Sequence, residues 1–161
     1  ELKKIMPFNA IIIRSSWIYS EFGKNFMKTM IKLGNKTNKL LIVDDQIGCP
    51  TYATDLAKAI LNIIKSKKFN QKKFQSQTYH YSCKDKVSWY KFAKKIFKLK
   101  NISCKVKPIS TEKYKTLAKR PKNSCLNCKK ILNSFNINLY SWKSSLKKCI
   151  REYYFNNIGR K

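Results

Sequence analysis

Glycine is scarce in this chain, which has only four among 161 residues. Turns that cradle a dinucleotide or a triphosphate need several glycines at fixed spacing, because the backbone must come close to the phosphates. Neither G-x-G-x-x-G nor the P-loop pattern occurs anywhere in the sequence. A cofactor-cradling turn at a first strand–helix junction is therefore excluded for these residues.

Acidic residues are also few, with Asp+Glu 8 against Lys+Arg 36 and a formal net charge of +28. Such a charge suits nucleic acid, since clustered cations neutralise phosphates. However, arginine, which base reading and phosphate forks favour, occurs only at positions 14, 120, 151 and 160. The lysines are spread along nearly every segment, and Ile and Asn are abundant as well. Compositional drift towards Lys, Ile and Asn explains the charge better than nucleic-acid binding, which we keep as the weaker alternative.

Long apolar runs are missing, and no stretch approaches the roughly 18 residues of a membrane span. The first residues, "ELKKIMPF", lack the organisation of a secretory signal. They also lack an initiator Met, so we expect the chain to begin partway through a larger protein. With 43% hydrophobic and 13% aromatic residues the chain can build a core. We expect a cytoplasmic protein of about one domain.

The six cysteines lack the spacing of a disulfide or zinc framework. Only Cys125 and Cys128 form a C-x-x-C pair; no second pair stands at zinc spacing, and the lone His80 is far away in sequence. We therefore expect reduced, mostly buried thiols and no metal centre.

Strand and helix patterns alternate along the chain and predict an α/β architecture. Residues 9–19 are β-branched and apolar without alternation, as in a strand buried on both faces of a parallel sheet. The predicted elements in order are a strand at 9–19, a helix at 24–36, a strand at 39–43, a helix at 55–65, a strand at 77–82, a helix at 87–99, an edge strand at 104–109, and closing helices at 124–135 and 142–154. The apolar face of the 87–99 helix is predicted to carry Trp89, Phe92, Ala93, Ile96 and Phe97.

Three local signals refine these elements. Gly34 is predicted to stop the 24–36 helix from just beyond its end. Thr54 is predicted to cap the helix that follows it, with Asp55 placed where the helix dipole favours a negative charge.

The stretch "VDDQIGCPT" at 43–51 places two acids side by side in a polar bend. Neighbouring side chains on an extended segment point in opposite directions, so Asp44 and Asp45 would not share one proton or one metal ion well. We interpret them as turn formers that accept backbone N–H bonds.

Five stretches in fixed order resemble one family. They are "RSSWIY" (14–19), "GKNFMKTM" (23–30), "VDDQIGCPTYATDLA" (43–57), "SWYKFAKKIF" (88–97) and "AKRPKNSCLNCKKI" (118–131). Together they resemble the dTDP-4-dehydrorhamnose reductases, which are extended short-chain dehydrogenases/reductases. The resemblance covers essentially the whole chain but only the C-terminal half of the family's length.

The resemblance implies a Rossmann domain that binds NADPH, with NADH left open, and a smaller domain that binds the nucleotide sugar. It assigns residues 9–19, 54–66 and 77–82 to the Rossmann domain, and 24–51 and 87–155 to the sugar domain. The implied reaction reduces the C4 ketone of dTDP-4-dehydro-6-deoxy-L-mannose to dTDP-L-rhamnose. A homodimer is compatible with the resemblance. Some family members use Mg²⁺, although no ligand cluster is evident here.

The family's general acid is the Tyr of a Y-x-x-x-K motif, followed closely by a Gly–Glu pair. Glu1 resembles that Glu, so we expect the catalytic Tyr and Lys upstream of Glu1 and no catalytic residue in this chain. Tyr90 and Lys94 match the spacing, but the motif around them resembles a supporting helix of the substrate domain. The chain alone is therefore expected not to reduce substrate. A non-catalytic, nucleotide-sugar-binding or regulatory relative is the main alternative.

Five residues are predicted to contact the substrate. Each has a purely structural alternative: a core tryptophan at a strand end, a helix cap, a loop-stabilising role for two bend residues, and a surface arginine. In that order they are Trp17, Asn25, Gln46 with Thr51, and Arg120. His80 aligns with a family strand and is interpreted as structural.

Overall fold

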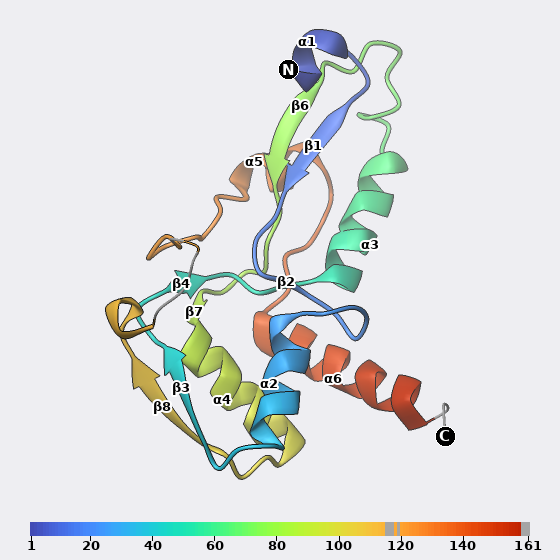
Figure 1. Cartoon of the computed structure of the whole chain (residues 1–161). Helices are drawn as coiled ribbons and strands as arrows, with labels where there is room; N and C mark the ends of the chain where they lie inside the picture. The colour runs from blue at the N-terminus through green and yellow to red at the C-terminus, as the bar shows by residue number, and fades with distance from the viewer. Residues whose placement is uncertain (115–117, 119, 159–161) are drawn as a thin grey trace.

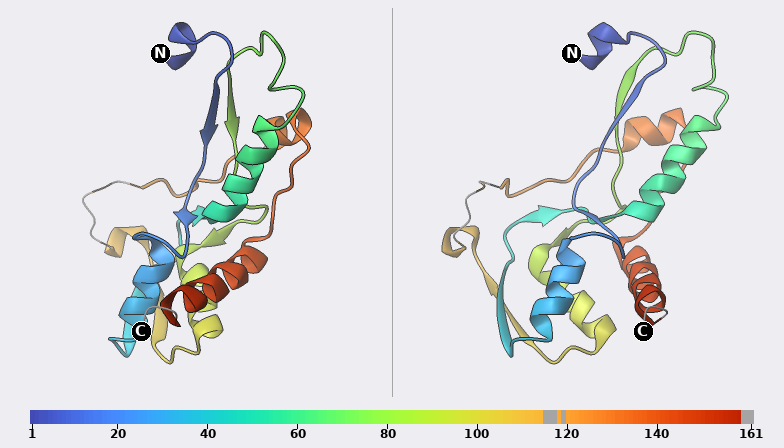
Figure 2. Two further views of the ribbon diagram at one scale, coloured as in Figure 1. Left: turned by 90° about the vertical axis from the view of Figure 1, so that its right-hand side faces the viewer. Right: turned by 45° about the vertical axis from the view of Figure 1, so that its right-hand side comes forward.

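The computed structural model describes residues 1–114, 118 and 120–158. Figures 1 and 2 show an elongated molecule with β1, β6, α3 and α5 towards one end, and α2, α4, β3 and β8 at the other. Its main elements are β1 (Ile11–Arg14), α2 (Phe26–Gly34), β3 (Lys39–Val43), α3 (Ala53–Ile64), β6 (Gln77–His80), α4 (Trp89–Lys100), β8 (Lys105–Ile109), α5 (Lys129–Ser134) and α6 (Trp142–Ile158). The shorter ones are α1 (Leu2–Ile5), β2 (Ile18–Tyr19), β4 (Ile47–Gly48), β5 (Thr51–Tyr52), β7 (Val87–Ser88) and the 3₁₀ helix η1 (Thr111–Lys113).

The predicted α/β class is confirmed, and the first strand pair is parallel. β1 lies beside β6 with Ile11 opposite Gln77. The prediction of a continuous strand over 9–19, buried on both faces, is wrong. β1 has four residues, of which Ile11 to Ile13 are half-buried and Arg14 is exposed. Within the described residues β1 pairs with β6 alone, so its other edge has no strand to cover it.

The second parallel pair, β3 with β8, confirms the predicted strands at 39–43 and 104–109. Helices α2 and α4 pack against each other, and α4 also contacts both strands of the pair. In β8, Val106 and Ile109 are half-buried and the other three residues are exposed, as expected for an edge strand.

Two helix ends differ from prediction. Gly34 is the last residue of α2 rather than the position beyond it. A Cβ at Gly34 would lie 2.7 Å from Cζ of Phe97 on α4, so the glycine allows close helix packing. Helix α3 begins at Ala53 with Tyr52 as its N-cap, so the predicted cap Thr54 lies inside the first turn. Asp55 is in the first turn as predicted, but it is buried and accepts a hydrogen bond from Ser145 of α6.

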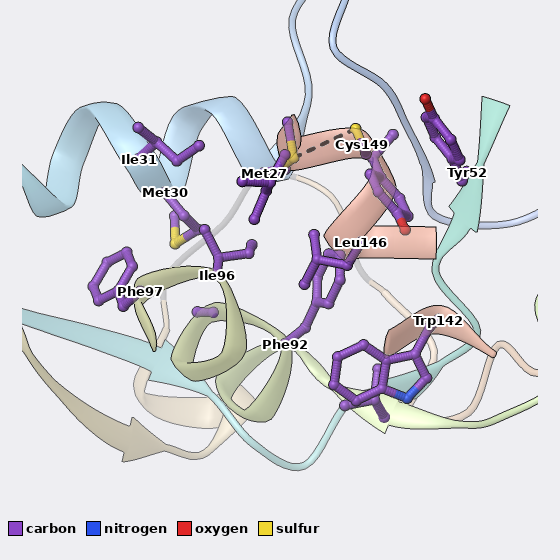
Figure 3. Close-up of a cluster of buried hydrophobic side chains, with 14 of the residues drawn as sticks. Met27, Met30, Ile31, Tyr52, Phe92, Ile96, Phe97, Trp142, Leu146 and Cys149 are labelled. Atoms are coloured by element: carbon purple, nitrogen blue, oxygen red, sulfur yellow. Dashed lines mark hydrogen bonds between the residues drawn. The ribbon is translucent and has the colours of Figure 1, made fainter. Parts of the chain in front are cut away.

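Side chains from three helices build the larger hydrophobic cluster (Figure 3). Helix α4 supplies Phe92 and Ile96, which meet Met27 of α2 and Leu146 of α6, all of them buried. The predicted apolar face of α4 is thus the one that is buried. A second, smaller cluster joins α3, β6 and α5 through Ala59, Ile63, Tyr79, Ile131 and Phe135.

The C-terminal helices have different bounds from those predicted. Helix α5 begins at Lys129, later than the predicted 124, and α6 continues past 154 to Ile158. Through Ile131, α5 packs with β6 and α3. The division into Rossmann and sugar domains stays a prediction. No helix in the described part of the chain is long and apolar enough to cross a membrane.

Candidate functional site

Trp17 follows β1 and stacks on Trp89, the central ring of an aromatic stack. Its backbone is left-handed, with φ 49°. Its indole lies on that of Trp89, the first residue of α4, with ring centroids 3.4 Å apart and planes 5° from parallel. Phe26 of α2 extends the group, with its ring centroid 4.4 Å from that of Trp89. The carboxyl end of β1 and the first residues of α2 and α4 therefore meet at one place.

Gly48 of the bend makes room for this stack. A Cβ at Gly48 would lie 2.3 Å from Cε2 of Trp17, which real contacts do not allow. The backbone N–H of Thr51 also donates to the carbonyl of Trp17 at 3.1 Å. Both the 43–51 bend and α4 therefore contact Trp17. Only glycine fits at position 48.

Asn25 caps α2, the structural alternative considered for it. Its Oδ1 accepts from the backbone N–H of Lys28 at 3.2 Å, and its Nδ2 donates to the carbonyls of Ser20 and Phe22 at 2.7 and 3.1 Å. These bonds order the turn that precedes α2. Both polar atoms of the amide are engaged, and substrate contact by Asn25 stays a prediction.

The two acids of the bend bind different partners, and the predicted bond from a backbone N–H is seen at Asp45. Asp44 accepts a hydrogen bond from the hydroxyl of Ser88, the N-cap of α4. Asp45 Oδ1 accepts from the backbone N–H and the hydroxyl of Thr111 at 2.9 and 2.7 Å. The Thr111 hydroxyl lowers the pKa of Asp45 below its usual value. These carboxylates fasten the bend to α4 and η1, and they do not form a catalytic pair.

Gln46 and Thr51 are buried within the bend. Gln46 is 6% exposed and its Nε2 donates to the Thr111 hydroxyl at 3.1 Å. Thr51 is 1% exposed and its hydroxyl donates to the carbonyl of Cys49 at 3.2 Å. These contacts are the loop-stabilising role considered from sequence. Substrate contact by either side chain stays a prediction.

Arg120 is exposed and lies on a segment that runs beside the bend. Ile47 donates its backbone N–H to the carbonyl of Lys122 at 2.8 Å, and Ser124 donates its own to the carbonyl of Ile47 at 2.9 Å. Among the described residues no carboxylate pairs with Arg120. Within the part of the chain that the structure describes, the Arg120 guanidinium thus has no carboxylate partner.

Two members of this site, Trp89 and Gly48, were not predicted to contribute. The sequence predicts Trp89 only as a member of the apolar face of its helix. The available sequence signal for Trp89 is its position directly after Ser88, the N-cap of α4. The first turn of this helix faces the strand ends. Nothing in the sequence alone pairs it with Trp17.

The other residues considered from sequence lie apart from this stack. The Lys94 ammonium is 5.5 Å from the Tyr90 ring centroid, and Lys94 is exposed on α4. His80 ends β6 opposite Arg14, and its structural role stays an interpretation. All six cysteines are free and five are buried, which confirms the predicted state of the thiols.

The described residues contain no glycine-rich turn of the kind that cradles a dinucleotide. β1 is followed by Ser15, Ser16 and Trp17 rather than a glycine-rich turn. Among the described glycines only Gly23, before α2, has positive φ. No step through a nicotinamide is therefore derived from this chain. In the described part of the chain no group of three or more His, Cys, Asp or Glu residues could hold a metal ion.

A comparison with family models matches residues 4–155 to the family described as "RmlD substrate binding domain". The chain belongs to this family. A dTDP-4-dehydrorhamnose reductase of Aggregatibacter actinomycetemcomitans is 41% identical over 89% of the chain and 50% of that relative. These matches confirm the resemblance that the five sequence motifs indicated.

Solved structures agree with the family. The RmlD-type chain matches a dTDP-4-dehydrorhamnose reductase of Clostridium acetobutylicum with a TM-score of 0.79 and 40% identity, over 89% of the chain and 49% of that structure. The reductase of Bacillus anthracis, in complex with NADP, matches with a TM-score of 0.77 and 39% identity, over 88% of the chain and 48% of that structure. The chain spans about half the length of the curated relatives it matches.

Proposed function

We propose that this chain is the nucleotide-sugar-binding part of a dTDP-4-dehydrorhamnose reductase. The whole protein would transfer a hydride from NADPH to the C4 ketone of dTDP-4-dehydro-6-deoxy-L-mannose and form dTDP-L-rhamnose. Membership of the RmlD family, the names of the matched relatives and the NADP in one matched structure support this proposal. A cytoplasmic location and a homodimer belong to the same proposal.

The observation that carries the proposal is the indole of Trp17. In open parallel sheets, ligands bind beyond the carboxyl ends of the strands, and Trp17 follows the carboxyl end of β1. An indole offers a flat apolar wall to a sugar or a base. Trp89 covers one face of the ring, yet Trp17 stays partly exposed. We assign Trp17 as the wall of the substrate site and Trp89 as its support.

Charge near the stack suits a diphosphate. Helix α2 starts beside it, and the first N–H groups of a helix attract anions. Arg120 offers a guanidinium, whose planar fork binds phosphate oxygens in pairs. We assign the diphosphate to this side of the site, between the start of α2 and the 120–124 segment.

The chain's own residues bind and orient the substrate and supply no proton to it. Of the pair at Y-x-x-x-K spacing, Lys94 is exposed on α4, and Tyr90 is half-buried and packs against the larger hydrophobic cluster. We therefore expect the 161-residue chain to bind the nucleotide sugar without oxidising NADPH. Turnover by the purified chain would contradict this division of labour.

Titration calorimetry with dTDP-L-rhamnose tests the proposal. We expect saturable binding by the chain and a loss of about fivefold or more in Trp17→Ala, since an aromatic contact contributes about 1 kcal/mol or more. Ile18→Ala is the matched control because Ile18 is the next residue and is 52% exposed. Equal affinity for the chain and Trp17→Ala, or no binding at all, would contradict the assignment.

The upstream reading frame separates the reductase from a non-catalytic relative, since both would bind the nucleotide sugar. An intact glycine-rich turn and Y-x-x-x-K motif would support the reductase. Decay of both, with binding retained, would contradict it.

A further inference from the structure

Four of the six cysteines gather at one cavity, although they stand far apart in sequence. The cavity has a volume of about 620 Å³, and Cys49, Cys83, Cys125 and Cys128 all line it. Cys49 comes from the 43–51 bend, Cys83 follows β6, and the last two precede α5. The fold thus brings together thiols that the sequence presents as isolated.

Cys49 is the centre of this thiol cluster. Ile47 and Asn123 form a parallel bridge, and Cys49 and Cys125 each lie two residues beyond it, so the two thiols are carried by neighbouring segments. The adjacent Cys83 thiol lowers the pKa of Cys49 to about 6 although the side chain is buried. Cys128 joins the cluster through Ser82, whose Oγ lies 3.5 Å from its sulfur.

The charges around the cavity favour an anionic sulfur. Lys84, Lys86 and Lys129 line it, against a single lining carboxylate, Asp85. Cations beside a thiol stabilise the thiolate, which is the nucleophilic form. The titratable groups that face Cys49 are the thiols of Cys83 and Cys125.

Cys125 is the partner best placed to react with Cys49. It is half-exposed, whereas Cys83 is buried and its thiol also donates to the carbonyl of Asp85 at 3.0 Å. Burial raises the pKa of Cys125 to about 11, so it stays protonated while Cys49 ionises. Ser124, the residue before Cys125, is already hydrogen-bonded to Ile47 of the bend.

We propose that Cys49 and Cys125 form a peroxide-sensitive thiol pair that closes to a disulfide. The Cys49 thiolate attacks a hydroperoxide, a new S–O bond forms, the O–O bond breaks, and the leaving oxygen takes a proton from solvent. The sulfur of Cys125 then attacks the resulting sulfenic acid. An S–S bond forms, and the sulfenic oxygen leaves as water with the Cys125 proton. Two thiols lose two electrons, and the peroxide O–O bond accepts them.

The disulfide would tie the bend that holds Trp17 to the segment that carries Arg120. Both sides of the proposed substrate site would then be linked covalently. The chemistry of the pair itself does not depend on the proposed function, because it rests on the thiol cluster alone.

Peptide mapping of the full 161-residue chain after hydrogen peroxide treatment tests the proposal. We expect loss of two thiols per chain, a Cys49–Cys125 linkage, and recovery of both thiols with a dithiol reductant. In Cys125→Ser, a substitution at a half-exposed position, Cys49 should stop at the sulfenic acid, which dimedone captures. Cys104→Ser is the matched control, because Cys104 is buried and contacts Thr37 away from the cavity. It should oxidise like the unaltered chain.

A second measurement does not need the disulfide. Alkylation of Cys49 by iodoacetamide at pH 7 should be at least tenfold faster than that of Cys104. Equal rates, a Cys125–Cys128 or Cys49–Cys83 linkage, or no thiol loss in tenfold excess peroxide would overturn the proposal. Stoichiometric zinc in the purified chain would also overturn it by assigning the cluster to a metal.

Discussion

The two hydrophobic clusters of this chain are covered very differently. The larger one is enclosed by α2, α4 and α6, and Met27, Ile96 and Leu146 in it are fully buried. Around the smaller one, Ile11 and Ile13 of β1 are only half-buried, and Ile5 nearby in the chain is 78% exposed. The larger cluster is closed by its own helices, whereas the end of the molecule with β1 and β6 leaves apolar surface in water.

The difference matters because the proposed site rests on the closed cluster. Trp17, Phe26 and Trp89 all pack against it. Regions with many buried apolar contacts open least often, so the stack sits on the most stable part of the chain. The β1 end of the site, by contrast, comes from the more weakly covered part.

Truncation of one large buried side chain in each cluster should give the clearest difference in the free energy of unfolding between the two clusters. Phe92→Ala should lower the free energy of unfolding by about 3–5 kcal/mol, because Phe92 is 1% exposed and contacts the rings of Tyr19 and Trp142. The matched variant Phe74→Ala, in the smaller cluster, should cost less, since its surroundings can collapse more easily. Urea unfolding measures both, and equal or reversed costs would contradict the comparison.

Filling the space at Gly48 should disturb the site while leaving the closed cluster intact. Gly48→Ala should cost up to about 3 kcal/mol and displace Trp17, because its Cβ would lie 2.3 Å from that indole. Binding of dTDP-L-rhamnose should fall with it. A Cβ at Gly23 meets nothing within 4 Å, so Gly23→Ala, despite its φ of +60°, is the control that should retain the stack. Unchanged binding in Gly48→Ala would contradict the role of the stack.

Removal of one hydroxyl oxygen should weaken the contact between α3 and α6. Ser145→Ala leaves the buried Asp55 of α3 without its hydroxyl donor on α6, which should cost about 1–3 kcal/mol. Ser144→Ala is the control on the exposed side of α6 and should stay within about 0.5 kcal/mol. Thermal unfolding compares the two. Equal effects would show that the Asp55–Ser145 bond contributes nothing.

The smallest effect concerns pH at the bend. The pKa of Asp45 is lowered, so its bonds to Thr111 persist above the unfolded-state value of about 3.8 and are lost as pH falls through the lower folded value. The amide resonance of Thr111 should titrate with a midpoint below 3.8, and it should lose this titration in Asp45→Asn. A midpoint at or above the ordinary value would contradict the observed hydrogen bonds.

Local features of the fold were predictable from sequence, because they depend on periodicity. The apolar positions of α4 include Phe92 and Ile96, and both are buried as the 3.6-residue spacing required. The prediction of Thr54 as an N-cap was wrong because the sequence pattern does not distinguish a threonine at the N-cap from one just inside the first turn, where Thr54 lies. The predicted burial of β1 on both faces was wrong because a strand's own residues do not show which other elements cover it.

The site was predictable as a region and not as a set of contacts. Ordered motifs indicated the family, and they predict Trp17 and Arg120 as substrate contacts, which stays a prediction. The Trp17–Trp89 stack joins residues far apart in the chain, and so does the cluster of Cys49 with Cys83 and Cys125. Such contacts follow from how β1, the bend and α4 are arranged, which no local pattern encodes.

The indole N–H resonances of the chain test the central claim most directly. Trp17 and Trp89 lie in the proposed site, and Trp142 is buried in the closed cluster, where it serves as an internal reference. During titration with dTDP-L-rhamnose the Trp17 resonance should shift saturably, the Trp89 resonance should follow it, and that of Trp142 should stay in place. A saturable shift confined to Trp142, or none at Trp17 at millimolar ligand, would contradict the assignment of Trp17 as the wall of a nucleotide-sugar site.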